Sequence, residues 1–538
     1  MNRRNLLIIL GFAMTAILGY WIAGTAAPPP VVRNKPAEPA AGPKRTIMID
    51  EVAPRFRRGE RAPSFRSDKE ANDAGALPGQ RVLAFKDRAA LEDFLKRAGK
   101  GIRILGRLDA LNALRIGFFN YADLAALLNG DEQSSFIFPV DVPSPGDATA
   151  QPGAVALGGG LLDWLGIVGD NSAWGAGVRI AVLDTGVASH PAFSSLLSWL
   201  NLVELPGDLS AQNGHGTAVA SVIIGNDRLT PGVAPGSEIL SIRIANDLGQ
   251  SDSFLLAQGI IAAVDGGAQL INISMGSFGD SSLVRSAIEY ARAAGALIIA
   301  ASGNAGLDRV TFPAANNGVI AVGSVDALGN HLEFSNTGSQ LALSAPGFGV
   351  NAAWVGGQAA SVSGTSFSAP IVAGAIAALM SQPGTAKLTA EQASNLLFAY
   401  LNDGGVAGSD PALGAGMPDI GRVLSRNTRG IYDAALASQR ILPPSAGYPN
   451  GQVEILIQNR GTERLINTGL QVSTPFGAVN TNITLLNPNA VQTILIPIQQ
   501  SSGTSLRYDS WVALSGGVKD AKPANDRRSE SYVPAVSN

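Results

Sequence analysis

The sequence predicts an α/β fold, with a mostly parallel open sheet that carries helices on both faces. Between residues 159 and 428, short strands that are apolar on both faces alternate with helical stretches, as is typical of buried parallel strands joined by helical crossovers. Ahead of this region, residues 80–140 predict a small α+β domain. From residue 445 to residue 538, short strands separated by turns predict an all-β sandwich.

The elements of the α/β region follow from its apolar periodicity. A helix is expected to begin at His215, because Val219, Val222 and Ile223 then share one apolar face. The expected strands are 178–183, 240–244, 270–274, 297–301, 319–325 and 341–345, and the expected helices are 215–224, 253–265, 281–294, 367–380 and 389–400.

The α+β region is predicted to have the order β-α-β-β-α-β. Leu91, Phe94 and Leu95 recur at helical spacing, and Asp87 precedes them as a candidate helix cap. The expected strands are 81–85, 102–108, 113–118 and 136–140, and the expected helices are 87–98 and 120–128.

The first 27 residues have the pattern of a segment that meets a membrane. Arg3 and Arg4 precede an apolar run over residues 6–23, and small residues follow it. This pattern predicts either a removable signal peptide or an uncleaved N-terminal membrane anchor, and the length of the run slightly favours the anchor. Either one implies an exported protein, periplasmic or extracellular. Residues 28–79, rich in Pro, Ala and Arg, and the turn-rich residues 141–158 are expected to be linkers.

Composition excludes several classes of function. The 538 residues carry a formal net charge of −3, which gives no reason to expect a nucleic-acid partner. The chain has no Cys, so disulfides, thiol catalysis and thiolate metal sites are excluded. It has only three His, which argues against a zinc site of several His and leaves few candidates for a general base.

Three short segments carry the chemistry. They are Val182-Leu183-Asp184-Thr185-Gly186, Asn213-Gly214-His215-Gly216-Thr217 and Gly364-Thr365-Ser366-Phe367-Ser368-Ala369-Pro370. A serine hydroxyl is a weak nucleophile that needs a base within hydrogen-bond reach, and the base needs a third group to fix its tautomer. Ser366, His215 and Asp184 supply one group of each kind, so the sequence predicts nucleophilic catalysis by Ser366.

Acyl transfer also needs hydrogen-bond donors directed at the tetrahedral oxyanion. Asn304 follows an expected strand end and is a candidate side-chain donor. Ser366 is expected to open a buried helix, so its backbone N–H is the second candidate and the helix N-terminus favours negative charge nearby.

These segments, in the order Asp, His, Ser, resemble those of the subtilisin-like serine peptidases, over about residues 159–428. The resemblance implies that Asp184 orients the base, His215 is the base, Ser366 the nucleophile and Asn304 the oxyanion donor. It also implies that the segment Ser274, Met275 and Gly276 pairs with the substrate backbone, and that Gly303 lines the pocket for the side chain before the scissile bond.

The chain departs from the family pattern at three places. Ala218 stands where a second His is common, and Phe367 stands where Met is usual next to the nucleophile. The stretch 226–233 offers Asp227 but no cluster of oxygen ligands. We therefore expect no cofactor and leave calcium open, because the calcium-holding loop that the resemblance implies is not evident here. His190 is expected to be structural.

Two flanking regions carry further resemblances. Residues 80–140 are similar to the propeptide domain of subtilisin-like proteases, which implies a zymogen whose partner is its own propeptide, removed by a cut within 141–158. The segments Asn459-Arg460-Gly461 and Asp520-Ala521-Lys522-Pro523-Ala524-Asn525-Asp526 are similar to the CARDB-type bacterial adhesion module. This second resemblance implies that the sandwich binds a protein or a cell-surface ligand.

Three functions remain open at this point. The first is a serine endopeptidase that acts on a protein or peptide substrate through an acyl-enzyme. The second is a ligase or cyclase that uses the same triad and passes the acyl group to an amine. The third is a membrane-tethered adhesion or scaffold protein with a silent peptidase domain, against which stands the complete set Asp184, His215, Asn304 and Ser366.

Overall fold

The computed structural model describes residues 68–143, 148–149, 151–194, 197–203, 213–382, 387–498 and 506–532. The expected signal peptide or membrane anchor and most of the linker after it lie outside these residues. In the described part of the chain, no helix has both the length and the apolar character that crossing a membrane requires.

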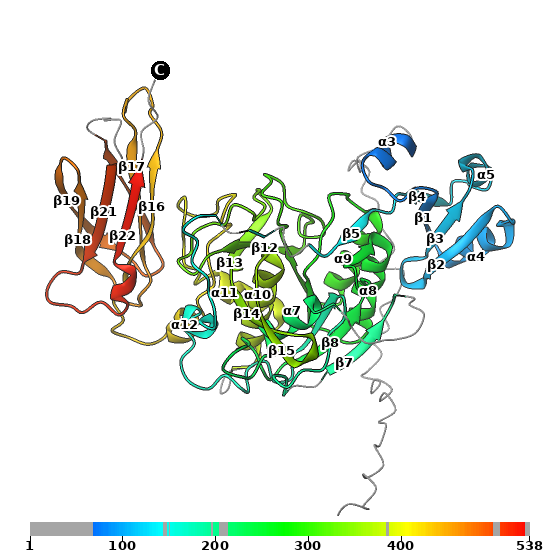
Figure 1. Cartoon of the computed structure of the whole chain (residues 1–538), viewed down its shortest axis with the longest axis horizontal. Helices are drawn as coiled ribbons and strands as arrows, with labels where there is room; N and C mark the ends of the chain where they lie inside the picture. The colour runs from blue at the N-terminus through cyan, green and yellow to red at the C-terminus, as the bar shows by residue number, and fades with distance from the viewer. Residues whose placement is uncertain are drawn as a thin grey trace, which may run out of the picture. The chain divides into compact units, whose positions relative to one another are not determined.

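A seven-stranded parallel sheet forms the centre of the α/β region (Figure 1). Every neighbouring pair in it is parallel, which confirms the predicted fold class. The edge strand β7 was not predicted. The strand order is β13 (Leu341–Pro346), β12 (Val319–Val325), β11 (Leu297–Ala301), β10 (Leu270–Ile273), β6 (Arg179–Asp184), β8 (Glu238–Arg243) and β7 (Leu197–Asn201).

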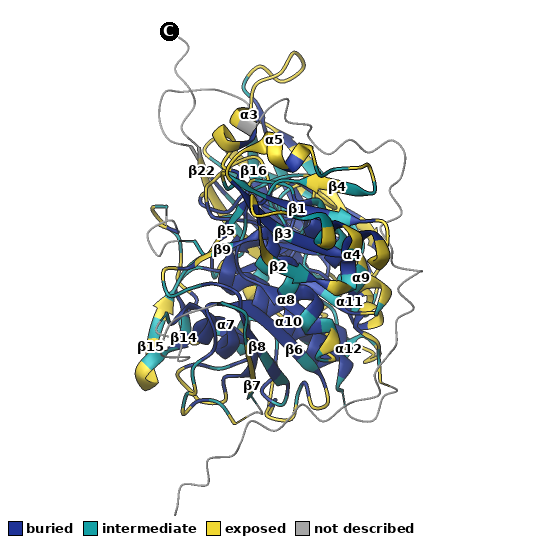
Figure 2. Ribbon diagram, turned by 90° about the vertical axis from the view of Figure 1, so that its right-hand side faces the viewer, coloured by how far each residue is buried: buried dark blue, intermediate teal, exposed yellow. Residues whose placement is uncertain are grey.

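Helices cover both faces of this sheet, as predicted, and each face has its own apolar core. The helices α7 (His215–Ile224), α10 (Thr365–Met380) and α11 (Ala390–Phe398) share one core. The helices α8 (Ser253–Asp265) and α9 (Ser282–Ala293) share the other. All residues of α7 and α10 are buried, and α7 is dark blue in Figure 2.

Shorter elements complete the α/β region and were not predicted. The strand β9 (Gln250–Asp252) precedes α8, and β14 (Val350–Trp354) and β15 (Gln358–Val362) form an antiparallel hairpin. The remaining short helices are α6 (Leu161–Trp164), α12 (Ile420–Ser425) and the 3-10 turn Val355–Gly357.

The N-terminal domain is an antiparallel sheet of order β2-β3-β1-β4 with the helices α4 and α5. Asp87 caps α4 by accepting from the Ala90 N–H, as predicted. The predicted strand 136–140 is wrong, because the fourth strand lies at Glu132–Ser135 and Pro139–Asp141 form a separate strand that pairs with β9. The elements are α3 (Asp68–Asp73), β1 (Gln80–Phe85), α4 (Arg88–Arg97), β2 (Ile102–Leu108), the 3-10 turn Asp109–Leu111, β3 (Ala113–Phe118), α5 (Tyr121–Ala125), β4 (Glu132–Ser135) and β5 (Pro139–Asp141).

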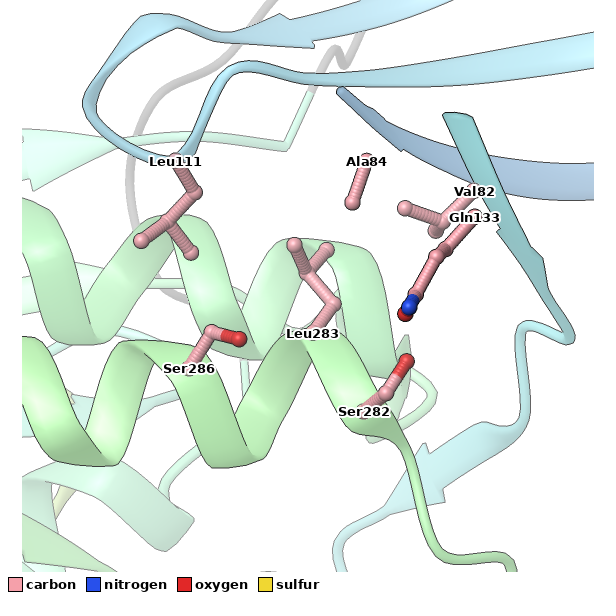
Figure 3. A pocket seen from close by; sticks show the side chains of 7 residues that line it. All are labelled: Val82, Ala84, Leu111, Gln133, Ser282, Leu283 and Ser286. Carbon is pink, nitrogen blue, oxygen red and sulfur yellow. The ribbon is translucent and has the colours of Figure 1, made fainter. Parts of the chain in front are cut away.

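One face of this small sheet packs on α8 and α9 of the α/β region. Val82 and Leu111 share an apolar core with Leu283, and Figure 3 shows these side chains facing one another around a small pocket. The Arg115 guanidinium lies 2.8 Å from the Asp252 carboxylate, and Asp252 also caps α8. Apolar burial therefore joins the two units, and a largely buried ion pair fixes their orientation at the contact.

The C-terminal region is a two-sheet sandwich with its own core, as predicted. Its first strand starts at Ala434, ahead of the expected boundary at residue 445, because Ala434–Leu442 pairs with the next strand along its whole length. The sheets are β16-β17-β20 and β19-β18-β21-β22, with β16 (Ala434–Leu442), β17 (Gln452–Asn459), β18 (Leu465–Thr474), β19 (Gly477–Leu486), β20 (Val491–Pro497), β21 (Leu506–Ala513), the 3-10 turn Pro523–Asn525 and β22 (Arg527–Tyr532).

A buried arginine joins the sandwich to the α/β region. Arg422 in α12 is 4% exposed and donates to the carbonyl oxygens of Leu401 (2.9 Å) and Arg460 (3.2 Å) and to the side chain of Asn489. Burial lowers the pKa of Arg422, and Asp419 opposes this effect. The guanidinium is thus the common donor of two units that are distant in sequence.

We expect Arg422→Leu to lower the free energy of unfolding by about 3 kcal/mol, because it leaves several buried acceptors without a donor. Urea unfolding followed by circular dichroism measures this change. The exposed Arg429 is the matched control, and Arg429→Leu should change stability by less than about 0.5 kcal/mol. Equal effects of the two substitutions would contradict the role given to Arg422.

The sandwich also contains a carboxyl group, that of Asp526, whose ionised form is destabilised by its surroundings. Burial, and then the neighbouring Asp520 and Asp433, raise the pKa of Asp526 to about 7. An unfolded Asp titrates near pH 4, at about 3.9, so the folded chain binds more protons than the unfolded chain between these values. The stability that this group contributes is therefore complete below about pH 4 and is lost as the pH rises through 7.

We expect Asp526→Asn to raise the midpoint of thermal unfolding at pH 8 and to leave it unchanged near pH 4. Asp509→Asn should do the opposite and lower the midpoint at pH 8, because the Ser529 hydroxyl and then Arg507 lower the pKa of Asp509 and stabilise its ionised form in the folded chain. A midpoint for Asp526→Asn that shifts equally at both pH values would contradict the assignment.

Candidate active site

The site lies at the carboxyl edge of three neighbouring strands. Asp184 ends β6, Ser274 directly follows β10, and Gly303 and Asn304 follow β11. Because β6, β10 and β11 are adjacent and parallel, their ends meet at one edge of the sheet. The first turn of α10 brings Ser366 to the same edge, and the helix begins at Thr365 rather than after Ser366 as predicted.

Asp184 and His215 form a direct buried pair. The His215 Nδ1 lies 2.8 Å from Asp184 Oδ1 and 3.0 Å from Oδ2, and Asp184 is fully buried. Asp184 Oδ1 also accepts from the Thr185 N–H at 2.7 Å, which fixes the carboxylate. The pair holds the proton of the imidazole on Nδ1, so Nε2 is left as the basic nitrogen.

Ser366 is held by reciprocal hydrogen bonds with Ser274. The Ser366 hydroxyl donates to the Ser274 carbonyl at 3.1 Å, and the Ser274 hydroxyl donates to the Ser366 carbonyl at 2.7 Å. The structure therefore records the nucleophile candidate bonded to Ser274 rather than to His215. Ser366 and His215 still lie in the first turns of α10 and α7, which pack together, and the ring of Phe367 lies 5.4 Å from that of His215. Catalytic hydrogen bonds often tighten only when substrate binds.

Asn304 is oriented by the residue before the serine. Its Oδ1 accepts from the Thr365 N–H at 2.9 Å and from the Thr365 hydroxyl at 2.7 Å, so its Nδ2 must be the donor side. That Nδ2 lies over Gly364, where an added Cβ would approach it to 2.9 Å and where φ is +133°. Glycine at 364 thus leaves the amide nitrogen uncovered beside Ser366.

The segment Ser274, Met275 and Gly276 presents backbone and not side chains. Met275 is 1% exposed and belongs to the core, whereas Gly276 exchanges two 3.1 Å hydrogen bonds with Asp141. On its other side the Pro139–Asp141 strand pairs with β9, and the Val142 N–H donates to the Gly249 carbonyl. Residues 139–142 therefore lie as an extended strand between two segments of the α/β region.

The other two His and the candidate calcium residue have local roles. His190 Nδ1 accepts from the Ala192 N–H, and its Nε2 bonds the Gln358 carbonyl. Burial lowers the pKa of His331. Asp227 accepts from the N–H groups of Leu229 and Thr230 in a tight turn. Across the residues that the structure describes, no three His, Asp or Glu side chains gather as a metal site would require.

Sequence reasoning missed several residues that position these groups. Thr365 orients Asn304, Asn213 caps the His215 N–H through its Oδ1 at 2.9 Å, and the Trp354 indole packs against Gly214 so closely that any Cβ there would collide. The flanking positions of Thr365 and Asn213 in the motifs were a usable signal. Trp354 offered none, because its contact depends on the fold of the β14–β15 hairpin.

The model of the Subtilase family matches residues 175–416. The chain is 36% identical over 252 residues to a thermostable alkaline protease of Halalkalibacterium halodurans, covering 46% of this chain and 68% of that protein. It is 38% identical over 212 residues to subtilisin Savinase of Lederbergia lenta, covering 39% of this chain and 77% of that protein.

Two solved structures are also similar. One is a variant of the protease domain of PatA, at 32% identity, with 48% of this chain and 97% of that chain covered and a TM-score of 0.43. The other is the prenylagaramide maturation protease PagA, at 30% identity, with 48% and 95% covered and a TM-score of 0.42. The fold, the edge at which the motifs meet and the sequence relatives agree, and the chain belongs to the subtilase family of subtilisin-like serine peptidases.

Proposed function

We propose that this chain is an exported serine endopeptidase that works through an acyl-enzyme on Ser366, with Asp184, His215 and Ser366 as its triad. The observation that carries the proposal is the buried pair of Asp184 and His215, 2.8 Å apart, in which Asp184 ends β6 and His215 begins α7, the helix that packs against the helix of Ser366.

The proposed steps use only groups of the chain and water. His215 Nε2 takes the proton of the Ser366 hydroxyl as its oxygen attacks the substrate carbonyl carbon. The oxyanion then accepts from Asn304 Nδ2 and the Ser366 N–H, which lies in the first turn of α10 where N–H groups lack helical acceptors. His215 returns the proton to the leaving amine, and water, activated in the same way, releases the acyl group.

The substrate is proposed to bind as an extended strand. The first segment proposed to bind in this way is the chain's own prosegment. The support is the paired segment 139–142, which occupies the backbone of Gly276 on one side and β9 on the other. Later residues belong to the α/β region, since the Leu157 N–H donates to Phe348 and the Val155 carbonyl accepts from Ala327. We therefore propose that maturation cuts the chain between residues 143 and 148, with residues 80–142 as the propeptide.

Fluorophosphonate labelling tests the proposed function. The wild-type chain should be labelled once, on Ser366, and Ser366→Ala should be neither labelled nor cut near residue 143. Failure of the wild type to label would favour a scaffold protein with a silent peptidase domain. A labelled enzyme that forms new peptide bonds with an added amine, without hydrolysis, would favour the ligase or cyclase.

We expect Asn304→Ala to lower kcat about 10²–10³-fold with little change in KM, because its amide nitrogen serves the oxyanion and not the ground state. The magnitude is that found for the corresponding change in a subtilisin, a member of the same family. Steady-state kinetics on a peptide p-nitroanilide measure the split. A rise in KM with kcat unchanged would assign Asn304 to ordinary substrate binding.

A further inference from the structure

Two backbone segments meet the start of α10. Segments 274–277 and 302–304 leave the adjacent strands β10 and β11; the Ser274 carbonyl accepts from the Ser366 hydroxyl, and the Gly303 N–H donates to the Thr365 hydroxyl. If Ser366 attacks a peptide, the side chain of the residue that supplies the carbonyl can enter only the space between these segments or point to solvent. The residues that fill this space thus decide which side chains are accepted.

Thr311 packs between these two segments and contacts both of them. A Cβ at Gly276 would lie 2.5 Å from Thr311 Oγ1, and a Cβ at Gly303 would lie 2.8 Å from Thr311 Cγ2. Ordinary contacts of a Cβ are longer than 3.4 Å, so the threonine is packed directly against both glycines. Thr311 is itself 6% exposed.

Thr311 is also fixed in place. Its N–H and its hydroxyl both donate to the Ser302 carbonyl, at 3.0 and 3.1 Å. The next residue, Phe312, exchanges two 2.8 Å hydrogen bonds with Ser277. Residues 311 and 312 therefore tie the two segments together, and moving Thr311 aside would break hydrogen bonds in a buried place.

A second buried residue supports the Gly303 side. Asn336 is fully buried, accepts from the Ala305 and Leu307 N–H groups, and directs its amide nitrogen at Gly303. The Asn336 N–H donates to the Gly303 carbonyl at 3.0 Å. Gly303 is thus held from behind by Asn336, so it cannot move away from Thr311 without breaking these contacts.

We infer that Thr311 closes the pocket next to Ser366, so that the enzyme accepts small side chains, of the size of Ala or Ser, before the scissile bond and rejects aromatic ones. This inference rests on the proposed function and adds the substrate class to it.

Two tetrapeptide p-nitroanilides that differ only in the last residue, Ala or Phe, test the inference. With active sites counted by fluorophosphonate, wild-type kcat/KM should favour Ala by about tenfold or more, the size of effect that a tight apolar pocket exerts. Thr311→Gly should raise the Phe/Ala ratio by about tenfold or more. Thr311→Ala, with a smaller rise, covers the case in which the glycine variant does not fold.

Thr311→Val is the matched control, because it keeps the volume and loses only the hydroxyl. Its Phe/Ala ratio should stay at the wild-type value. A wild type that cleaves the Phe substrate as well as the Ala substrate overturns the inference and leaves the proposed function standing. If the wild type cleaves neither substrate and is not labelled by the fluorophosphonate, both the inference and the proposed function are wrong.

Discussion

His215→Ala should abolish peptidase activity while the chain remains folded. Without the imidazole, no base is within reach of the Ser366 hydroxyl, because the other two His bond elsewhere in the structure. We expect kcat to fall about 10⁶-fold, the loss found when the corresponding His is removed from a subtilisin, a relative of this chain. Reaction with a fluorophosphonate should be lost to a similar extent, because the reagent needs the same activated oxygen.

Circular dichroism and the thermal midpoint separate this effect from unfolding. Asp184 keeps the Thr185 N–H and hydroxyl as donors in the variant, so its carboxylate is not left unpaired. His190→Ala is the matched control, since His190 lies in the same domain and bonds only the backbone near Gln358 and Ala192. Activity retained in His215→Ala would remove His215 as the base.

Asp184→Asn is the second largest expected effect, a loss of about 10⁴-fold in kcat. Oδ1 accepts from the Thr185 N–H at 2.7 Å, so the carboxamide oxygen of the variant must remain there. Its NH₂ then faces His215 Nδ1, which must accept, and the imidazole proton moves to Nε2. An imidazole protonated on Nε2 cannot take the proton of Ser366, although the geometry is unchanged.

Steady-state kinetics and thermal unfolding of Asp184→Asn measure this effect. KM and the thermal midpoint should change little while kcat falls, because shape and packing are preserved. Asp163→Asn, a change of the same kind in the short helix α6, is the control. A variant with near-normal kcat would show that His215 does not depend on Asp184 for its tautomer.

The parts of the fold that repeat a simple period were predictable from sequence. The expected helices at 215–224 and 253–265 match α7 and α8 to the residue, since each has a defined start before a mostly apolar stretch. The expected strands at 297–301 and 319–325 match β11 and β12, because parallel strands buried on both faces are continuous apolar runs.

The errors arose where pairing decides the structure. Residues 136–138 are an apolar run that attracted a strand prediction, but Ile137 and Phe138 pack into cores while the strand itself lies at Glu132–Ser135. The β14–β15 hairpin was missed because its second strand is mostly exposed and carries no period-two pattern. Strand pairing of this kind depends on partners far away in sequence.

For the site, the motifs named the residues that the sheet edge brings together, but not the residues that hold them. Asp184, His215, Asn304 and Ser366 are recognisable because each stands in a short glycine-rich segment. Thr311 gave no local signal, since its place between Gly276 and Gly303 depends on where the chain crosses back between β10 and β11.

The bonding of Arg422 has a practical consequence for anyone who prepares this enzyme in pieces. A shortened version that stops after α12 would keep the guanidinium and discard Arg460 and Asn489, which accept from it. Tyr400, Leu401 and Asn402 would still accept from its Nη1, while its Nε and Nη2 would lose their partners. We therefore expect such a shortened chain to be less stable to urea than the full chain, because the sandwich supplies part of the hydrogen bonding of this buried cation.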